Sequence, residues 1–288
     1  MTHYASFTAA DGTPTWGVII DGTAYDLGPT GLGLAAGLKD AVARGVFGTV
    51  RDHAAAPARP EAEITFLPAV TDPGKIICIG VNYRTHQQET GRTEQKAPTV
   101  FTRFADTQIG HLAPAVYPAA STRFDYEGEL ALVIGRDAFH VAETDAYDYV
   151  AGYAAYNDFT ARDWQRVTSQ WIPGKNFPGT GAFGPYLVPA ADLGPVSDLK
   201  LETRVNGAVR QSASVADLYF PIPELIAYVT GFTRLAAGDV IVTGTPGGVG
   251  MFMDPPGLLS PGDVVEVEIT GLGVLRNRIV SELDGRGA

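Results

Sequence analysis

Cysteine is nearly absent from this chain of 288 residues, and its scarcity excludes several kinds of site. Cys78 is the single cysteine, so no intramolecular disulfide can form, and no zinc or iron–sulfur site built from several thiolates is available. The residue lies in the apolar run 76–79, which predicts a buried, inert thiol rather than a nucleophile.

Basic residues and long hydrophobic runs are scarce as well. The chain has 21 Lys and Arg against 32 Asp and Glu, a net charge of −11, which argues against a nucleic-acid partner because phosphate backbones are bound by clustered cations. No apolar run reaches the ~18 residues of a membrane span, and residues 1–5 lack the start of a secretory signal. We therefore expect a cytoplasmic protein without a membrane partner.

Glycine and proline, by contrast, are abundant, with 34 and 20 residues, which favours a turn-rich fold with few long helices. Short β-branched runs alternate with turn residues, and this predicts an α+β, β-rich roll or sandwich rather than a doubly wound sheet. The ranges expected to form strands are 75–80, 129–134, 149–156, 199–205, 240–243, 264–269 and 275–280, and those expected to form helices are 160–169 and 222–230.

The first part of the chain predicts a small α/β domain over residues 1–68, followed by a larger domain over 69–288. Asp21-Gly22 separates two apolar runs and indicates a tight hairpin turn. A short amphipathic helix is expected to end near Gly45. Residues 54–63 contain two prolines and no apolar face, so we expect a linker there.

Two carboxylates, Glu127 and Glu129, stand two residues apart at the start of an apolar run. On a strand, residues i and i+2 point to the same face, so the two anions would repel each other unless a proton or a cation lies between them. Oxygen ligands beside a hydrophobic core favour a hard divalent cation such as Mg²⁺ or Mn²⁺. An exposed acidic strand edge is the alternative interpretation.

Asp158 follows the apolar run 150–156 and would supply a third oxygen ligand. If a helix begins there, Arg162 lies one turn later on the same face, where its guanidinium would bind a substrate carboxylate. An aspartate that caps a helix and pairs with a local arginine explains the same residues without any chemistry.

His86 and Glu89 are spaced as neighbours on a helical turn, so the carboxylate would orient the imidazole for proton transfer with water. Residues 84–96 are strongly polar, and we expect this segment to close over a ligand. A solvated surface helix is the alternative.

Two glycine-rich loops complete the candidate site. Lys175 lies in the loop 173–181, whose glycines would let the backbone approach a ligand. The loop 244–250 follows an apolar strand, and the Thr245 hydroxyl with backbone N–H groups would stabilise an oxyanion there. It is not a phosphate loop, because the Gly-Lys-Ser/Thr ending is missing. Turns without any chemistry are the alternative at both places.

Taken in order, these segments resemble the fumarylacetoacetate hydrolase family. The resemblance extends from about Lys75 to Ile279 and rests on residues 79–83, 98–104, 125–135, 157–165, 174–177, 205–207, 238–241 and 244–250. It implies a catalytic domain at 69–288 with a mixed β-sandwich roll, a small N-terminal domain at 1–68, and a homodimer.

The family's motifs also imply individual roles, and a divalent cation, Mg²⁺ or Mn²⁺ with Ca²⁺ able to replace them in crystals. The matching positions are the metal ligands Glu127, Glu129 and Asp158, the catalytic residues His86, Glu89 and Lys175, and the substrate-binding residues Arg103, Arg162, Gln165 and Thr245. Many members have lysine where Arg103 stands.

The reaction predicted from the resemblance is hydrolysis of a carbon–carbon bond in a 1,3-dicarbonyl or acylpyruvate-like anionic oxo acid, with water activated by His86 and a metal-bound enolate. A decarboxylase, a tautomerase or isomerase, or a hydratase of an oxo-dicarboxylic acid from aromatic or sugar-acid catabolism is the rival, because such members use the same enolate. A binding protein without activity is the third hypothesis, which any metal-dependent turnover would reject.

Overall fold

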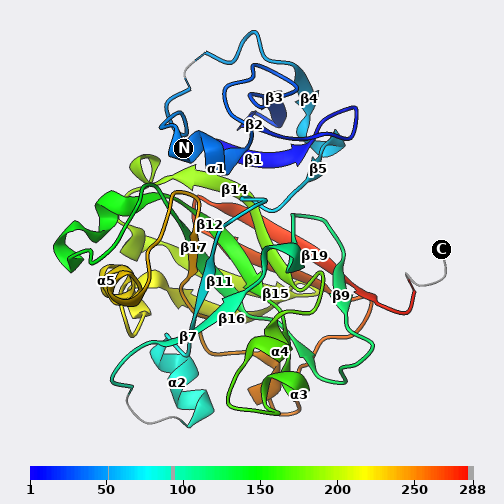
Figure 1. Cartoon of the computed structure of the whole chain (residues 1–288). Helices are drawn as coiled ribbons and strands as arrows, with labels where there is room; N and C mark the ends of the chain where they lie inside the picture. The colour runs from blue at the N-terminus through cyan, green and yellow to red at the C-terminus, as the bar shows by residue number, and fades with distance from the viewer. Residues whose placement is uncertain (51, 92–94, 285–288) are drawn as a thin grey trace.

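A large mixed sheet forms the frame of the molecule in a computed structural model that describes residues 1–50, 52–91 and 95–284 (Figure 1). Its strands, in pairing order, are β4 (Ala58–Pro60), β3 (Thr23–Asp26), β2 (Pro14–Ile20), β1 (His3–Thr8), β14 (Gly181–Pro189), β12 (Val150–Asp158), β11 (Gly128–Ile134), β17 (Val240–Val242), β6 (Ile76–Gly80) and β7 (Thr99–Arg103), with β5 (Thr65–Phe66) on β1 and β8 (Gln108–Ile109) on β14.

A second sheet packs against this frame and closes a β-sandwich roll. Its strands, in order, are β16 (Ala208–Ser214), β15 (Lys200–Val205), β18 (Val264–Ile269), β19 (Gly273–Ser281) and β9 (Ala115–Tyr117), and a separate ribbon joins β10 (Phe124–Asp125) to β13 (Thr160–Ala161). The α-helices are α1 (Leu38–Ala43), α2 (Arg84–Thr90), α3 (Arg162–Gln165), α4 (Ile172–Lys175) and α5 (Ile222–Phe232). The arrangement confirms the predicted α+β, β-rich class.

Strand β11 shows why the sheet lies at the centre of the molecule. Every residue of β11 is buried, as its nearly continuous apolar sequence predicts for a strand covered on both faces. Side chains alternate between two cores: Leu130 and Leu132 belong to the core between the sheets, while Ala131 and Val133 belong to the core on the other face. Glu129 shares the face of Ala131 and Val133, at the end of the strand where that core stops.

The N-terminal residues extend the large sheet. Tyr4 of β1 pairs with Leu187 of β14, so strands from both sides of the predicted boundary at residue 68 belong to one sheet. The predicted hairpin forms, with φ of 47° at Asp21 and 72° at Gly22. The linker expected at 54–63 is wrong: β4 pairs with β3 there, because edge pairing tolerates proline on its open side.

Two other local predictions need correction. The helix expected over 160–169 is replaced by the short strand β13 and the single-turn helix α3. Strand β12 extends to Asp158 and the chain stays extended through β13, so helical structure begins only at Arg162. The loop expected at 173–181 contains helix α4, which ends at Lys175, and Gly174 is needed for packing: a Cβ on it would lie 2.4 Å from the backbone nitrogen of Gln165. That glycine therefore brings α4 against α3 rather than against a ligand.

One end of the sheet gathers the segments with polar side chains. Strand β11 begins there and β12 ends there, because the two are antiparallel. Strand β17 is antiparallel to β11 and parallel to β6, so the C-terminal ends of β17 and β6 lie at the same end of the sheet. Helices α2, α3 and α4 follow or precede these strand ends and cover them (Figure 1). No helix in the described part of the chain is long and apolar enough to cross a membrane.

Candidate active site

The carboxylates of Glu127, Glu129 and Asp158 converge at this end of the sheet. One oxygen of each lies within 4.8 Å of the others, and all three residues are buried. The pairing of β11 with β12 produces this cluster, because the Asp158 N–H donates to the Glu127 carbonyl at 2.9 Å and places the two residues opposite each other. The structure thus brings together the three predicted ligands and excludes the exposed acidic edge.

The three acids have different electrostatic environments. Burial would raise the pKa of the Glu127 carboxyl, but Lys175 and Arg162 outweigh burial and hold it at about 2. Burial, followed by the charges of Asp158 and Glu127, raises the pKa of Glu129 well above its usual value. Glu129 accepts the Gly244 N–H at 2.6 Å, and within the described residues no Lys or Arg forms an ion pair with it.

Lys175 lies between two of the acids. Its Nζ atom is 2.7 Å from Glu127 Oε2 and 2.6 Å from Asp158 Oδ2, and it lies 5.0 Å from the centre of the Phe101 ring. Burial would lower the pKa of the Lys175 ammonium, but Asp158 and Glu127 outweigh that effect and raise it. The side chain is therefore a permanent cation at neutral pH and acts as a charged hydrogen-bond donor rather than as a base.

Two buried arginines, Arg162 and Arg103, form ion pairs with carboxylates of the acidic cluster. Arg162 donates from Nε to Asp125 at 2.8 Å and from Nη1 to Glu127, while its Nη2 is buried without a hydrogen-bond partner among the described residues. Arg103 binds Asp158 through Nη1 and donates to the Thr180 hydroxyl at 2.7 Å. Arg103 does not line the cavity, so in this structure it positions Asp158, in contrast to the predicted contact with substrate.

His86 and Glu89 form the predicted pair on helix α2. His86 Nδ1 lies 3.1 Å from Glu89 Oε2, and the other oxygen of Glu89 accepts the Gly248 N–H at 2.5 Å. The backbone turns into α2 at Val81 with φ of 55°, a strained conformation for a β-branched residue. His86 is the one buried residue of α2 and lines the cavity, so its imidazole is not a solvated surface group, although the rest of the helix is exposed or half-buried. Of the predicted closing segment 84–96, residues 92–94 lie outside the described residues.

The loop 244–250 has a different role from the predicted one. The Thr245 hydroxyl donates to the Gly128 carbonyl at 2.9 Å and accepts from Gln211 Nε2 at 2.7 Å, so its proton is already used. Gly244 has φ of 104°, which directs its N–H to Glu129. The loop therefore helps to hold the acidic cluster in place. In contrast to the predicted role, the Thr245 hydroxyl donates its proton to the Gly128 carbonyl and does not offer it to an oxyanion in this structure.

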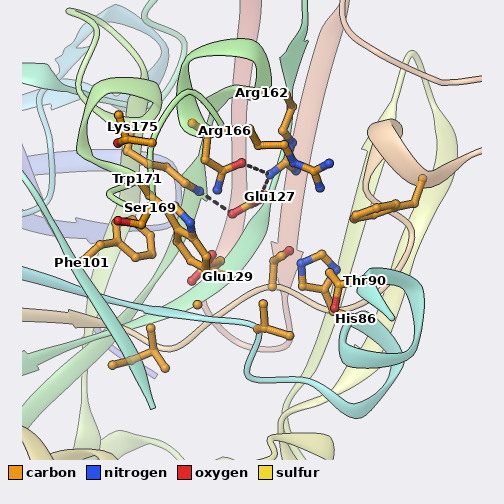
Figure 2. Close-up of a pocket in the computed structure, with 17 residues that line it drawn as sticks. His86, Thr90, Phe101, Glu127, Glu129, Arg162, Arg166, Ser169, Trp171 and Lys175 are labelled. Atoms are coloured by element: carbon orange, nitrogen blue, oxygen red, sulfur yellow. Dashed lines mark hydrogen bonds and ion pairs between the residues drawn. The ribbon is translucent and has the colours of Figure 1, made fainter. Parts of the chain in front are cut away.

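These side chains surround one cavity of about 440 Å³ (Figure 2). Of the predicted residues, those that line it are His86, Glu127, Glu129, Arg162, Gln165, Lys175 and Thr245, whereas Asp158, Glu89 and Arg103 lie behind the lining. Figure 2 shows Lys175 and Arg162 directed at Glu127, with His86 facing the same space from α2.

Asp125 is a site residue that the sequence interpretation missed. Its carboxylate is fully buried and accepts the N–H groups of Gly250 at 2.9 Å and Met251 at 3.0 Å, in addition to the bond from Arg162. It thus connects the end of the 244–250 loop to Arg162. An aspartate immediately before two carboxylates on a buried run was the available signal, since a buried charge requires partners.

The donor set suits a divalent cation. Three buried carboxylate oxygens at close range are the hard ligands that Mg²⁺ or Mn²⁺ prefer, and Glu129 has no cationic partner within the described residues. Glu127, Glu129 and Asp158 could therefore hold such an ion.

Comparison with known proteins gives the family. The model of the fumarylacetoacetate hydrolase C-terminal domain matches residues 75–280, so the chain belongs to this family, as its motifs predict. It is 41% identical to the mitochondrial oxaloacetate tautomerase Fahd2a of Rattus norvegicus over 78% of this chain and 72% of the rat protein. It is 42% identical to the oxaloacetate tautomerase YisK of Bacillus subtilis over 76% of this chain and 74% of that protein.

Solved structures agree with the fold. The fumarylacetoacetate hydrolase of Exiguobacterium antarcticum superposes with a TM-score of 0.87 at 34% identity, over 98% of this chain and all of that one. Maleylpyruvate hydrolase from Sphingobium sp. SYK-6 gives a TM-score of 0.79 at 26% identity, over 97% of this chain and 99% of that one.

Proposed function

We propose that this protein is a divalent-cation-dependent enzyme that interconverts the keto and enol forms of a 2-oxo acid, with oxaloacetate as the first substrate to test. The observation that carries the proposal is that the His86 imidazole and the Lys175 ammonium line the same cavity as the carboxylates of Glu127 and Glu129. The rat and Bacillus subtilis relatives, both oxaloacetate tautomerases, support this reaction over carbon–carbon cleavage.

The interconversion moves one proton between C3 of the acid and its 2-oxo oxygen. Because Glu89 holds Nδ1 of His86, the Nε2 atom is the nitrogen that takes the proton at C3 or returns it. The ammonium of Lys175 donates a hydrogen bond to the 2-oxo oxygen, on which negative charge develops. Solvent water supplies the proton that this oxygen gains in the enol, and His86 releases the proton taken from C3 to solvent, so one proton leaves C3 and one reaches the oxygen. Glu127, Glu129 and Asp158 would hold a Mg²⁺ or Mn²⁺ ion, which would supply positive charge that stabilises the enolate.

The decisive assay follows the disappearance of enol oxaloacetate by its ultraviolet absorbance, with Mg²⁺, with Mn²⁺ and with a chelator. We expect catalysis with either ion, none with the chelator, and none in a Glu127→Ala variant under any condition. Glu143→Ala, which changes an exposed glutamate on the protein surface, is the matched control and should behave as the unaltered protein. An undiminished rate in metal-free protein would refute the proposal.

Hydrolysis of an acylpyruvate is the second candidate, and the His86–Glu89 pair favours it because cleavage requires an oriented base to activate water. Product analysis by mass spectrometry separates the two reactions: cleavage of an acylpyruvate releases pyruvate and a second acid, whereas tautomerisation leaves the mass unchanged. The anionic oxo acid and the homodimer remain predictions for this chain.

A further inference from the structure

The outer part of the cavity presents a guanidinium that the proposed reaction does not use. Arg166 is exposed and is one of the residues that line the cavity (Figure 2). Its guanidinium carbon lies 5.6 Å from the centre of the Phe252 ring. Phe252 also lines the cavity, and its ring lies edge-on to the His86 ring at 6.1 Å. Arg166 therefore belongs to the wall that contains His86.

The cationic side chains that line the cavity differ in their burial. Lys175 and Arg162 are buried and are bound to the carboxylates of Glu127, Asp158 and Asp125. Arg166, by contrast, is exposed and directly follows the last residue of helix α3, four positions after Arg162. The cavity wall thus contains buried cations that are bound to the acidic cluster and an exposed guanidinium, that of Arg166.

We propose that Arg166 binds the remote carboxylate of a dicarboxylic 2-oxo acid and makes the site selective for such acids over monocarboxylic acids of equal length. This inference rests on the proposed function, since it assumes that the 2-oxo end lies at the acidic cluster. A guanidinium suits the role because it is weakly hydrated, stacks on an aromatic ring and matches a carboxylate with two parallel donors. Contact with Phe252 restricts the side chain before the acid arrives.

The cavity also has an apolar wall that would favour the opposite selectivity. Ile79, Phe101 and Trp171 line it, and Trp171 packs so closely on Gly80 that a Cβ there would lie 2.1 Å from the indole. A substrate with an apolar tail would pack against this wall and would not need Arg166 for binding. The two walls therefore predict different substrate preferences, which a matched pair of acids can separate.

Oxaloacetate and 2-oxobutanoate form that pair, because both have four carbons and only the first has a second carboxylate. Exchange of the C3 protons with deuterated solvent, followed by NMR in the presence of Mg²⁺ and corrected for the uncatalysed rate, measures enolisation of both acids in the same way. We expect Arg166→Gln to lower the ratio of kcat/KM for oxaloacetate to that for 2-oxobutanoate about tenfold, mainly through KM for oxaloacetate. Arg166→Lys should recover part of the ratio, since it keeps the charge but loses the paired donors.

Arg234→Gln is the matched control. It removes another exposed guanidinium that lies over a phenylalanine ring, that of Phe139 at 4.3 Å, at a position that does not line the cavity. This variant should keep the ratio of the unaltered protein. An unchanged ratio in Arg166→Gln, including one that results from an equal loss of kcat/KM on both acids, would overturn the assignment. A preference for 2-oxobutanoate in the unaltered protein would also overturn it.

Calorimetry makes the inference separable from the proposed reaction. If the unaltered protein exchanges neither acid, the proposed function fails, but the heats of binding of the same two acids still test Arg166. Tighter binding of oxaloacetate than of 2-oxobutanoate, lost in Arg166→Gln and kept in Arg234→Gln, supports the role of Arg166. Equal binding of both acids by the unaltered protein rejects it.

Discussion

Replacing Glu129 by glutamine tests whether the acidic cluster is built for a cation. Glutamine has nearly the same shape as glutamate, so its carbonyl oxygen can still accept the Gly244 N–H that Glu129 accepts at 2.6 Å. The substitution removes the carboxyl group whose ionisation burial and the charges of Asp158 and Glu127 disfavour, and it supplies an amide that can donate to either of these acids. Without a divalent ion, it should therefore stabilise the protein, whereas most substitutions of buried residues destabilise.

The magnitude follows from the separation of the charges. Ligand oxygens within 4.8 Å of one another repel by about 3 kcal/mol per pair at an effective dielectric constant of 20. Glu129 faces two such anions, and the ammonium of Lys175 offsets part of the repulsion. A net gain of roughly 1–3 kcal/mol in the free energy of unfolding corresponds to a rise in Tm of about 2–5 °C for a chain of this size.

The assay is thermal unfolding at pH 8 with a chelator and then with Mg²⁺ or Mn²⁺. With the chelator, Glu129→Gln should melt above the unaltered protein; with the ion, the unaltered protein should gain stability and the variant should gain little, because binding to the folded state stabilises it. Glu143→Gln, at an exposed position, is the control and should change neither result. A variant that melts lower with the chelator, or that gains as much from the ion, would refute the reasoning.

Three further predictions concern other parts of the molecule. Burial lowers the pKa of His111 to about 4, so between pH 6.5 and 4 the unfolded chain binds a proton that the folded chain does not, and stability falls as the pH falls; His111→Gln should reduce the loss of Tm between pH 7 and 4.5. Glu89→Gln should lower kcat for enol oxaloacetate roughly tenfold or more, because His86 loses the charge that orients it. Asp125→Asn should lower the free energy of unfolding by roughly 3 kcal/mol in urea titrations, because Arg162 loses a buried ionic partner.

An equal loss of Tm at low pH in His111→Gln would show that other groups cause the acid sensitivity. A large drop in Tm for Glu89→Gln would mean that the helix, rather than the imidazole, was disturbed. Asp148→Asn, at an exposed aspartate, should leave the urea midpoint unchanged, and an equal loss there would contradict the role of Asp125.

Local sequence patterns predicted the strands well where apolar residues form short runs. The range 264–269 coincides with β18, and 129–134 falls within β11, because these residues are buried on one or both faces in the final fold. The pattern failed for β4 and β14, whose sequences are rich in proline, glycine or alanine. Those residues have little strand preference of their own, so pairing with β3 and β12 determines their conformation.

The sequence by itself determined which chemical groups are available and which of them share a strand face or a helical turn. Glu129 belongs to β11 and Glu127 directly precedes that strand, so the two carboxylates stay near each other, and His86 and Glu89 are neighbours on one helical turn. The carbon–carbon hydrolysis favoured by the sequence alone shares these groups with tautomerisation, which is why local spacing did not separate the two reactions.

Only the tertiary structure decided how those groups are paired. Lys175 meets Glu127 across 48 residues of sequence, and Arg103 meets Asp158 across 55. Such contacts depend on the order of strands in the sheet and on the directions of long side chains, which no local period encodes. For the same reason only the structure shows that the Thr245 hydroxyl donates to the Gly128 carbonyl instead of facing an oxyanion, that Asp125 binds Arg162, and that Arg166 lines the cavity.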